Sequence, residues 1–104
     1  MQIKLYKLMG VTPSGGHWFI RLEHCEGGIG GDYTSCVLYS KAGDALTSVY
    51  STREEAERAL QEYQRYLDSF HHGLPTFTAY GDHRCLRVKA ERLTVSVVEF
   101  TAEV

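Results

Sequence analysis

The sequence lacks the long apolar segment that a membrane-spanning helix needs. No apolar run in the 104 residues approaches the roughly 18 residues of such a helix. The first residues, Met1 to Lys7, also lack the apolar core and the small-residue cleavage site of a signal peptide. These absences predict a soluble protein of the cytoplasm with no membrane partner.

An excess of positive charge is absent too. Eleven Lys and Arg residues stand against thirteen Asp and Glu residues, so the formal net charge is −2. A uniformly basic surface that would attract nucleic acid is therefore excluded. Apolar residues make up 43% and charged residues 23%, as in an ordinary globular protein, which argues against a disordered tail. Length and composition together predict one α+β domain over residues 1–104.

Cysteine is too scarce, and odd in number, for a disulfide framework. The three cysteines are Cys25, Cys36 and Cys85, and an odd count in a short chain favours reduced thiols. We expect Cys36 and Cys85 to be small core residues. The closely spaced cysteine or histidine pairs of zinc sites are also missing. The sequence therefore predicts no metal and no cofactor, and it contains no recognisable catalytic constellation.

What the sequence does contain is one clear amphipathic helix over about residues 52–71. Apolar side chains recur there at spacings of three and four residues, which places them on one stripe. The start carries a capping box in either of two registers, with Ser51 or Thr52 as the N-cap. Pro75 prevents the helix from continuing. The stripe consists of Ala56, Leu60, Tyr63, Leu67 and Phe70.

The remaining segments are predicted to be strands and turns, in the order ββββαβββ. The segment 17–24 alternates most clearly, with Trp18, Ile20 and Leu22 on one face. We expect an antiparallel sheet of about five to seven strands, with the helix packed across one face. The expected strands are residues 3–9, 17–24, 33–40, 45–50, 76–80, 85–90 and 93–100.

A glycine-rich loop over residues 25–32 does not fit a phosphate-binding loop. Phosphate-binding loops open onto a helix N-terminus, whereas this one leads into the strand pattern that begins at Tyr33. The glycines instead predict a mobile hairpin connection. Ile29 and Asp32 of this loop are candidate binding residues, on a contact surface that orders when a partner binds.

Charge is unevenly distributed although its sum is close to zero. The helix is acidic on its expected solvent face, where it could contact a basic protein surface or imitate nucleic acid. The segment 84–92 is basic and could bind phosphates from one face of a strand. Its other interpretation is a solvated edge strand that cations protect against aggregation. The acidic candidates are Glu54, Glu57 and Glu62, and the basic candidates are Arg84, Arg87, Lys89 and Arg92.

At the level of pattern, the chain resembles small proteins that phages and other mobile elements encode. The shared features are a Trp-bearing early strand at residues 16–20, a hairpin, and a helix that opens with the sequence S-T-R-E-E-A at residues 51–56. Some anti-CRISPR proteins are similar in size, strand content and acidic bias. The resemblance covers roughly residues 16–70 and implies a stoichiometric binder that occludes a nucleic-acid channel or a partner surface. The basic segment after the helix departs from it.

These features predict a non-enzymatic binding or inhibitor protein that occludes a surface of a macromolecular partner. The partner would be a protein or a protein–nucleic-acid complex, for example a defence complex in the cytoplasm of a host cell. A small nucleic-acid-binding protein that uses residues 84–92 is the alternative. Because one helix shields only one face of a sheet, a homodimer through the other face also remains open.

Overall fold

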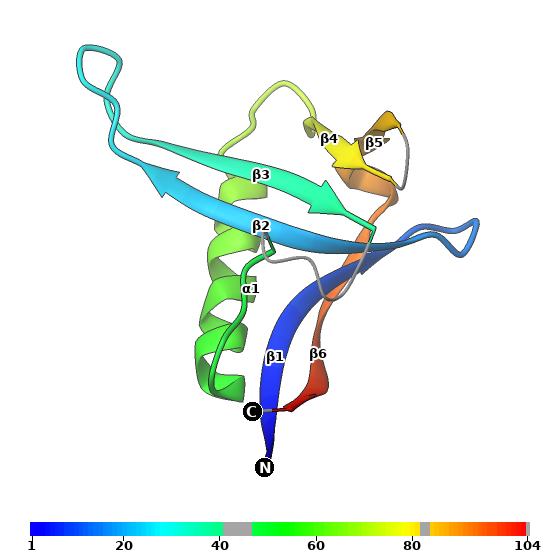
Figure 1. Ribbon diagram of the computed structural model, residues 1–104. Coiled ribbons are helices and arrows are strands. Elements are labelled where there is room, and N and C mark those ends of the chain that lie inside the picture. Colours follow the sequence, from blue (N-terminus) through cyan, green and yellow to red (C-terminus); the bar gives the residue numbers. More distant parts are fainter. Residues whose placement is uncertain (41–46, 82–83, 104) are drawn as a thin grey trace.

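The computed structural model describes residues 1–40, 47–81 and 84–103. Within these residues the elements follow in the order βββαβββ, which confirms an α+β protein with one helix and a sheet of the expected size (Figure 1). The elements are β1 at Gln2–Val11, β2 at His17–Cys25, β3 at Tyr33–Tyr39, α1 at Arg53–Asp68, β4 at Thr76–Tyr80, β5 at Cys85–Lys89, the short 3-10 helix η1 at Ala90–Arg92, and β6 at Thr94–Glu103.

The strands form a mixed sheet in the order β5-β4-β3-β2-β1-β6. Strands β3 and β4 are parallel, whereas the other neighbours are antiparallel. The prediction of a purely antiparallel sheet is therefore wrong. Helix α1 is the reason, because it carries the chain from the end of β3 back to the start of β4, and such a crossover joins parallel strands.

The predicted strand over residues 45–50 is also wrong. Its first two positions lie outside the described residues, and the rest makes only an isolated bridge. β1 and β2 pair only near the turn that joins them and then diverge. Ser48 donates a backbone hydrogen bond to Ile20 in β2, while Tyr50 exchanges two with Tyr6 in β1. This extended segment therefore bridges two diverging strands, so the order before the helix is βββ.

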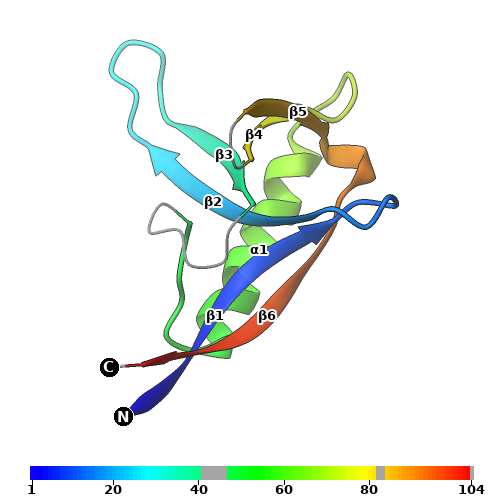
Figure 2. The ribbon, with the colours of Figure 1, turned by 45° about the vertical axis from the view of Figure 1, so that its right-hand side comes forward.

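Helix α1 lies against one face of the sheet and closes the hydrophobic core there (Figure 2). Of the predicted stripe, Ala56 and Tyr63 are buried and the other members are half-buried. Ala59 is buried as well, although the stripe did not include it. The sheet contributes to the same cluster Leu8, Ile20, Cys36, Leu38, Phe77 and Ala79, and η1 adds Ala90.

The helix begins where the sequence predicts and ends earlier than predicted. The Thr52 hydroxyl accepts a hydrogen bond from the backbone N–H of Glu55 at 3.2 Å, which confirms Thr52 as the N-cap. The last helical residue is Asp68, and the C-cap Ser69 donates its hydroxyl to the Tyr66 carbonyl at 2.6 Å, which satisfies one of the terminal carbonyls. Among the described helices, none has the length and apolar character that crossing a membrane requires.

The two edge strands are close in the chain although they stand at opposite ends of the strand order. Only η1 and Leu93 separate β5 from β6, which pairs with β1 along its whole length. The sheet must therefore curl strongly, and Figures 1 and 2 show it wrapped around α1. The curl brings the β1–β2 turn, at Pro13 and Ser14, beside β5.

Strand β5 shows the predicted alternation but not the predicted cysteine burial. Arg87 and Lys89 are exposed on one face, while Leu86 and Val88 are half-buried on the other. Cys85 shares the exposed face with the two cations, so its prediction as a core residue is wrong. Because β5 is an edge strand with one solvated face, Cys85, the first residue on that face, is exposed.

Candidate functional site

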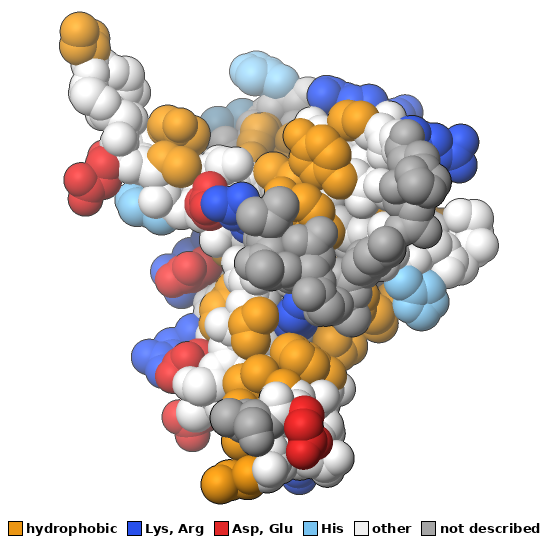
Figure 3. Space-filling model, in the orientation of Figure 1, with side chains coloured by type: hydrophobic (Ala, Val, Ile, Leu, Met, Phe, Trp, Pro, Cys, Tyr) orange, Lys and Arg blue, Asp and Glu red, His pale blue; other side chains and the backbone are white. Residues whose placement is uncertain are grey.

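The most prominent feature of the molecular outline is the β2–β3 arm, defined here as residues 23–35. It projects from the body at the upper left of Figure 1 and carries an apolar tip in Figure 3. That tip is Ile29, whose exposed fraction reaches 110%. Tyr33, at the start of β3, is 58% exposed. The arm therefore presents large apolar side chains away from the core.

Glycine sets the conformation of the arm tip. Gly31 adopts a φ of 77°, and its N–H donates to the Gly28 carbonyl at 3.4 Å. A Cβ at Gly27 would overlap the carbonyl oxygen of Gly31, so this position accepts no side chain without a rearrangement. The glycines thus allow a tight turn that holds Ile29 outward.

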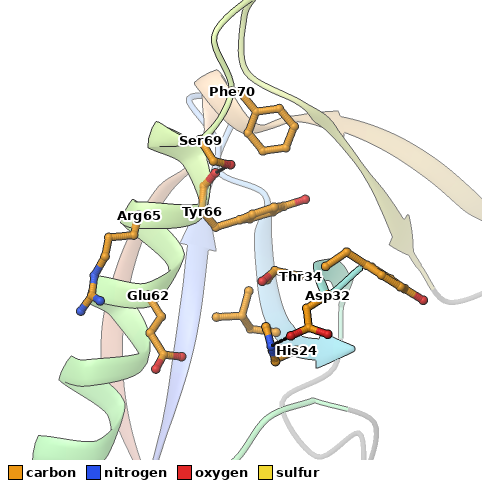
Figure 4. Close-up of a pocket in the computed structure, with 10 residues that line it drawn as sticks. His24, Asp32, Thr34, Glu62, Arg65, Tyr66, Ser69 and Phe70 are labelled. Carbon is orange, nitrogen blue, oxygen red and sulfur yellow. Dashed lines mark hydrogen bonds and ion pairs between the residues drawn. The ribbon is translucent and has the colours of Figure 1, made fainter. Parts of the chain in front are cut away.

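The inner side of the arm and helix α1 enclose an open groove of about 850 Å³, which we call the arm–helix groove. Tyr66 extends from α1 toward Thr34 of the arm, and Phe70 packs edge-on against Tyr66 with ring centroids 5.1 Å apart (Figure 4). The lining residues are Leu22, His24, Asp32, Tyr33, Thr34, Glu62, Arg65, Tyr66, Ser69 and Phe70.

Groups of both charge signs line the arm–helix groove. His24 and Asp32 lie 3.8 Å apart on the arm, a contact that is an ion pair only when the imidazole is protonated (Figure 4). Glu62 and Arg65 stand on the helix side. At the base of the arm, a hydrogen bond with Cys25 raises the pKa of the Tyr33 hydroxyl. The groove therefore combines aromatic rings with charged groups of both signs.

A second hollow, of about 610 Å³, continues the arm–helix groove along α1. It shares Leu22, His24 and Glu62 with the first. It then extends toward the start of the helix, where Tyr50 and Arg58 line it. The flank of α1 that faces β2 is therefore hollowed over most of its length.

A third hollow, of about 670 Å³, lies at the opposite end of the sheet, and we call it the basic hollow. Its charged lining side chains are all cations, from β5 and η1. The β1–β2 turn forms its other wall. The lining residues are Thr12, Pro13, Ser14, Arg87, Val88, Lys89 and Arg92.

The structure places the predicted loop and helix residues in different surroundings. Asp32 and Glu62 both line the arm–helix groove, and Ile29 stands at the tip of the arm above it. Glu54 and Glu57 are exposed on α1 and line none of the three hollows. The predicted acidic residues of α1 therefore do not share one site.

The predicted basic residues stay together. Arg87, Lys89 and Arg92 line one hollow, and Arg84 is exposed just before β5 without lining it. Sequence alternation identified the shared face of β5, but it gave no sign of the turn that completes the hollow.

Sequence reasoning missed the aromatic part of the arm–helix groove. Tyr66 and Phe70 are four residues apart, a spacing that brings side chains together at a helix end. The predicted stripe places Phe70 in the core and does not include Tyr66. The signal that could have found them is that two aromatic residues occupy the helix end next to the glycine-rich hairpin.

In the described part of the chain, no three His, Cys, Asp or Glu side chains gather closely enough to hold a metal ion. Comparison of the chain with protein-family models, with curated proteins and with solved structures gives no match.

Proposed function

We propose that this chain is a binding protein that occludes a surface of a macromolecular partner, which it contacts through the β2–β3 arm and the arm–helix groove. The observation that carries the proposal is the full exposure of Ile29 at the tip of a projecting arm. An isolated apolar side chain gains free energy when it leaves water for a partner's pocket. The glycine-shaped turn beneath it directs that side chain outward.

The composition of the arm–helix groove supports the same proposal. Interface centres are enriched in aromatic residues and arginine, with polar groups at the rim. Tyr66 and Phe70 supply the rings, and Arg65 and the His24–Asp32 pair lie around them. A segment of the partner that enters this groove would place Ile29 against the adjoining surface.

The resemblance to anti-CRISPR proteins suggests what the partner does. Inhibitors of that kind block a channel or surface of a nucleic-acid-handling complex, and we extend that role to this chain. The setting would be the cytoplasm of a host cell. The described thiols are all free, as suits a reducing compartment. The projecting arm gives a small protein the reach that such blocking needs.

A substitution at the arm tip tests this proposal. Ile29→Asp should weaken binding of a partner captured from a lysate of the source organism by at least about tenfold, because a charge replaces an apolar anchor. Val49→Asp is the matched control, since Val49 is also an exposed β-branched residue but lies outside the arm. Affinities are compared with the purified partner by calorimetry.

Equal weakening by both substitutions would contradict the role of the arm, since any added charge would then act alike. Unchanged binding by Ile29→Asp would do so more directly. Circular dichroism of both variants checks that the fold is retained. We expect that it is, because neither side chain is part of the core.

A further inference from the structure

We infer that the outer face of β4 and β5, together with the basic hollow, binds the phosphate backbone of single-stranded nucleic acid. This site uses none of the residues of the β2–β3 arm or the arm–helix groove. It therefore goes beyond the proposed function and stands or falls independently of it.

Three cations converge on the basic hollow. Arg87 and Lys89 project from the same face of β5, and Arg92 projects from η1; all three are exposed. None of them forms an ion pair within 4.0 Å in the described part of the chain. Figure 3 shows Lys and Arg side chains gathered over this end of the sheet. Cations without carboxylate partners are available to neutralise phosphates.

Hydroxyl groups form the opposite wall of the hollow. The Thr12 and Ser14 hydroxyls lie 3.0 Å apart on the β1–β2 turn. The turn is held in place because the backbone N–H of Gly16 donates to the Thr12 hydroxyl and that of Gly15 to the Thr12 carbonyl. Ser14 is exposed and can donate to a phosphate oxygen. The hollow thus offers both charge and hydrogen-bond donors.

An exposed ring stands on the same face as the cations. Tyr80 pairs with Cys85 across the strands, and Thr78 pairs with Arg87, so Tyr80 and Arg87 point to the same side of the sheet. The Tyr80 ring is 46% exposed and stacks on Tyr39 with centroids 5.5 Å apart, which holds its orientation. The Tyr80–Cys85 pair lies two residues along the strands from the Thr78–Arg87 pair, which corresponds to a separation of about 7 Å.

A line of cations with an aromatic platform at one end is the combination that binds single-stranded nucleic acid. Cations track the backbone and a ring accepts a base by stacking, without preference for sequence. Because the net charge of the chain is −2, phosphate binding here would rest on this local group of cations and not on an overall positive charge. An acidic peptide would use the cations but not the ring.

The test is fluorescence anisotropy with a labelled oligothymidylate of about 12 nucleotides, at salt concentrations of about 50 and about 200 mM. Arg87→Ala/Lys89→Ala should weaken binding about tenfold or more at low salt and should reduce the salt slope by about 1.4, at about 0.7 per lost phosphate contact. Lys4→Ala/Arg53→Ala, which removes one exposed lysine and one exposed arginine that line none of the three hollows, is the charge-matched control and should leave both quantities nearly unchanged.

Substitutions of Tyr80 distinguish the binding of nucleic acid from that of other polyanions. Tyr80→Ala should weaken binding about tenfold without a change in salt slope, whereas Tyr80→Phe keeps the ring and the affinity. The inference is overturned if the wild type shows no binding at low salt, or if the two double variants behave alike. It is also overturned if polyglutamate displaces the oligonucleotide at equal charge concentration and Tyr80→Ala has no effect, because the site would then suit an acidic protein. Ile29→Asp should bind the oligonucleotide normally.

Discussion

Replacing Leu38 by alanine is expected to lower the free energy of unfolding by about 3 kcal/mol. Leu38 is fully buried in β3, between the parallel neighbour β4 and the antiparallel neighbour β2. It belongs to the core cluster that α1 closes. Removing a buried leucine side chain costs its transfer free energy and leaves a cavity, which together amount to about 2–5 kcal/mol. Urea unfolding followed by circular dichroism measures the change.

Leu74→Ala is the matched control for this prediction. Leu74 is 46% exposed and lies in the connection between α1 and β4. The same truncation there should change the free energy of unfolding by less than about 0.5 kcal/mol. Similar effects at both positions would contradict the assignment of Leu38 to the centre of the core.

Tyr63 should respond in opposite directions to two substitutions. Its ring is 3% exposed and packs near Phe77, with ring centroids 6.3 Å apart, but its hydroxyl is buried without a hydrogen-bond partner among the described residues. Tyr63→Phe removes that unsatisfied group and should raise the free energy of unfolding by about 1 kcal/mol. Tyr63→Ala removes the ring as well and should lower it by about 3 kcal/mol. A loss of stability in Tyr63→Phe would show that the hydroxyl is satisfied.

Alkaline pH gives the Tyr63 prediction a second measurement. Burial raises the pKa of Tyr63 above its ordinary value of 10.0, and burial raises the pKa of Cys36 from 9.0 to about 12. The folded protein therefore keeps both groups protonated where the unfolded chain ionises them, so stability falls as pH rises above about 9. Tyr63→Phe should lose less stability than the wild type above about pH 10. An identical decline in both proteins would contradict the burial of the hydroxyl.

Local patterns predicted the elements of this fold well. The helix start follows from Thr52 and Glu55, and alternation places Trp18 and Ile20 on the face that α1 covers. These features depend on neighbours in the chain, which is why sequence alone carries them. The helix end at Asp68 is not specified by the apolar spacing, which continues to Phe70.

The pairing of strands could not be predicted from the same patterns. A purely antiparallel sheet and a mixed sheet bury the same side chains, so alternation does not distinguish them. The parallel contact between β3 and β4 follows from the path of α1. The segment 47–50 has an extended pattern, yet the divergence of β1 and β2 decides its position.

The burial of Lys7 is a further feature that local sequence patterns do not predict. Lys7 alternates with buried Leu8 and would be expected in solvent, but only 2% of it is exposed. Its ammonium lies 5.5 Å from the ring centroid of Phe19 and 5.4 Å from that of Phe100, and it hydrogen-bonds the Thr47 hydroxyl. Ring faces attract a cation when strands bring them together, and their positions in the chain are far apart.

The candidate sites also contain some features that one segment of the sequence predicts and others that need contacts between distant segments. The sequence predicts that Ile29 is exposed and that Arg87 and Lys89 share one face, because both inferences need only a loop or a strand. The arm–helix groove needed the approach of Tyr66 to the β2–β3 arm. The basic hollow needed the curl of the sheet that brings Ser14 beside β5. Such contacts between distant segments arise only in the folded chain.

Site-specific photo-crosslinking tests the central claim, that the arm tip contacts the partner, most directly. A photoreactive amino acid replaces Ile29 at the arm tip or, as a control, Ser96, which is exposed on β6. In a lysate of the source organism, position 29 should give one dominant adduct that excess wild-type protein suppresses, and position 96 should not give it. Equal adducts from both positions, or none that the wild type suppresses, would contradict a partner surface occluded by the arm.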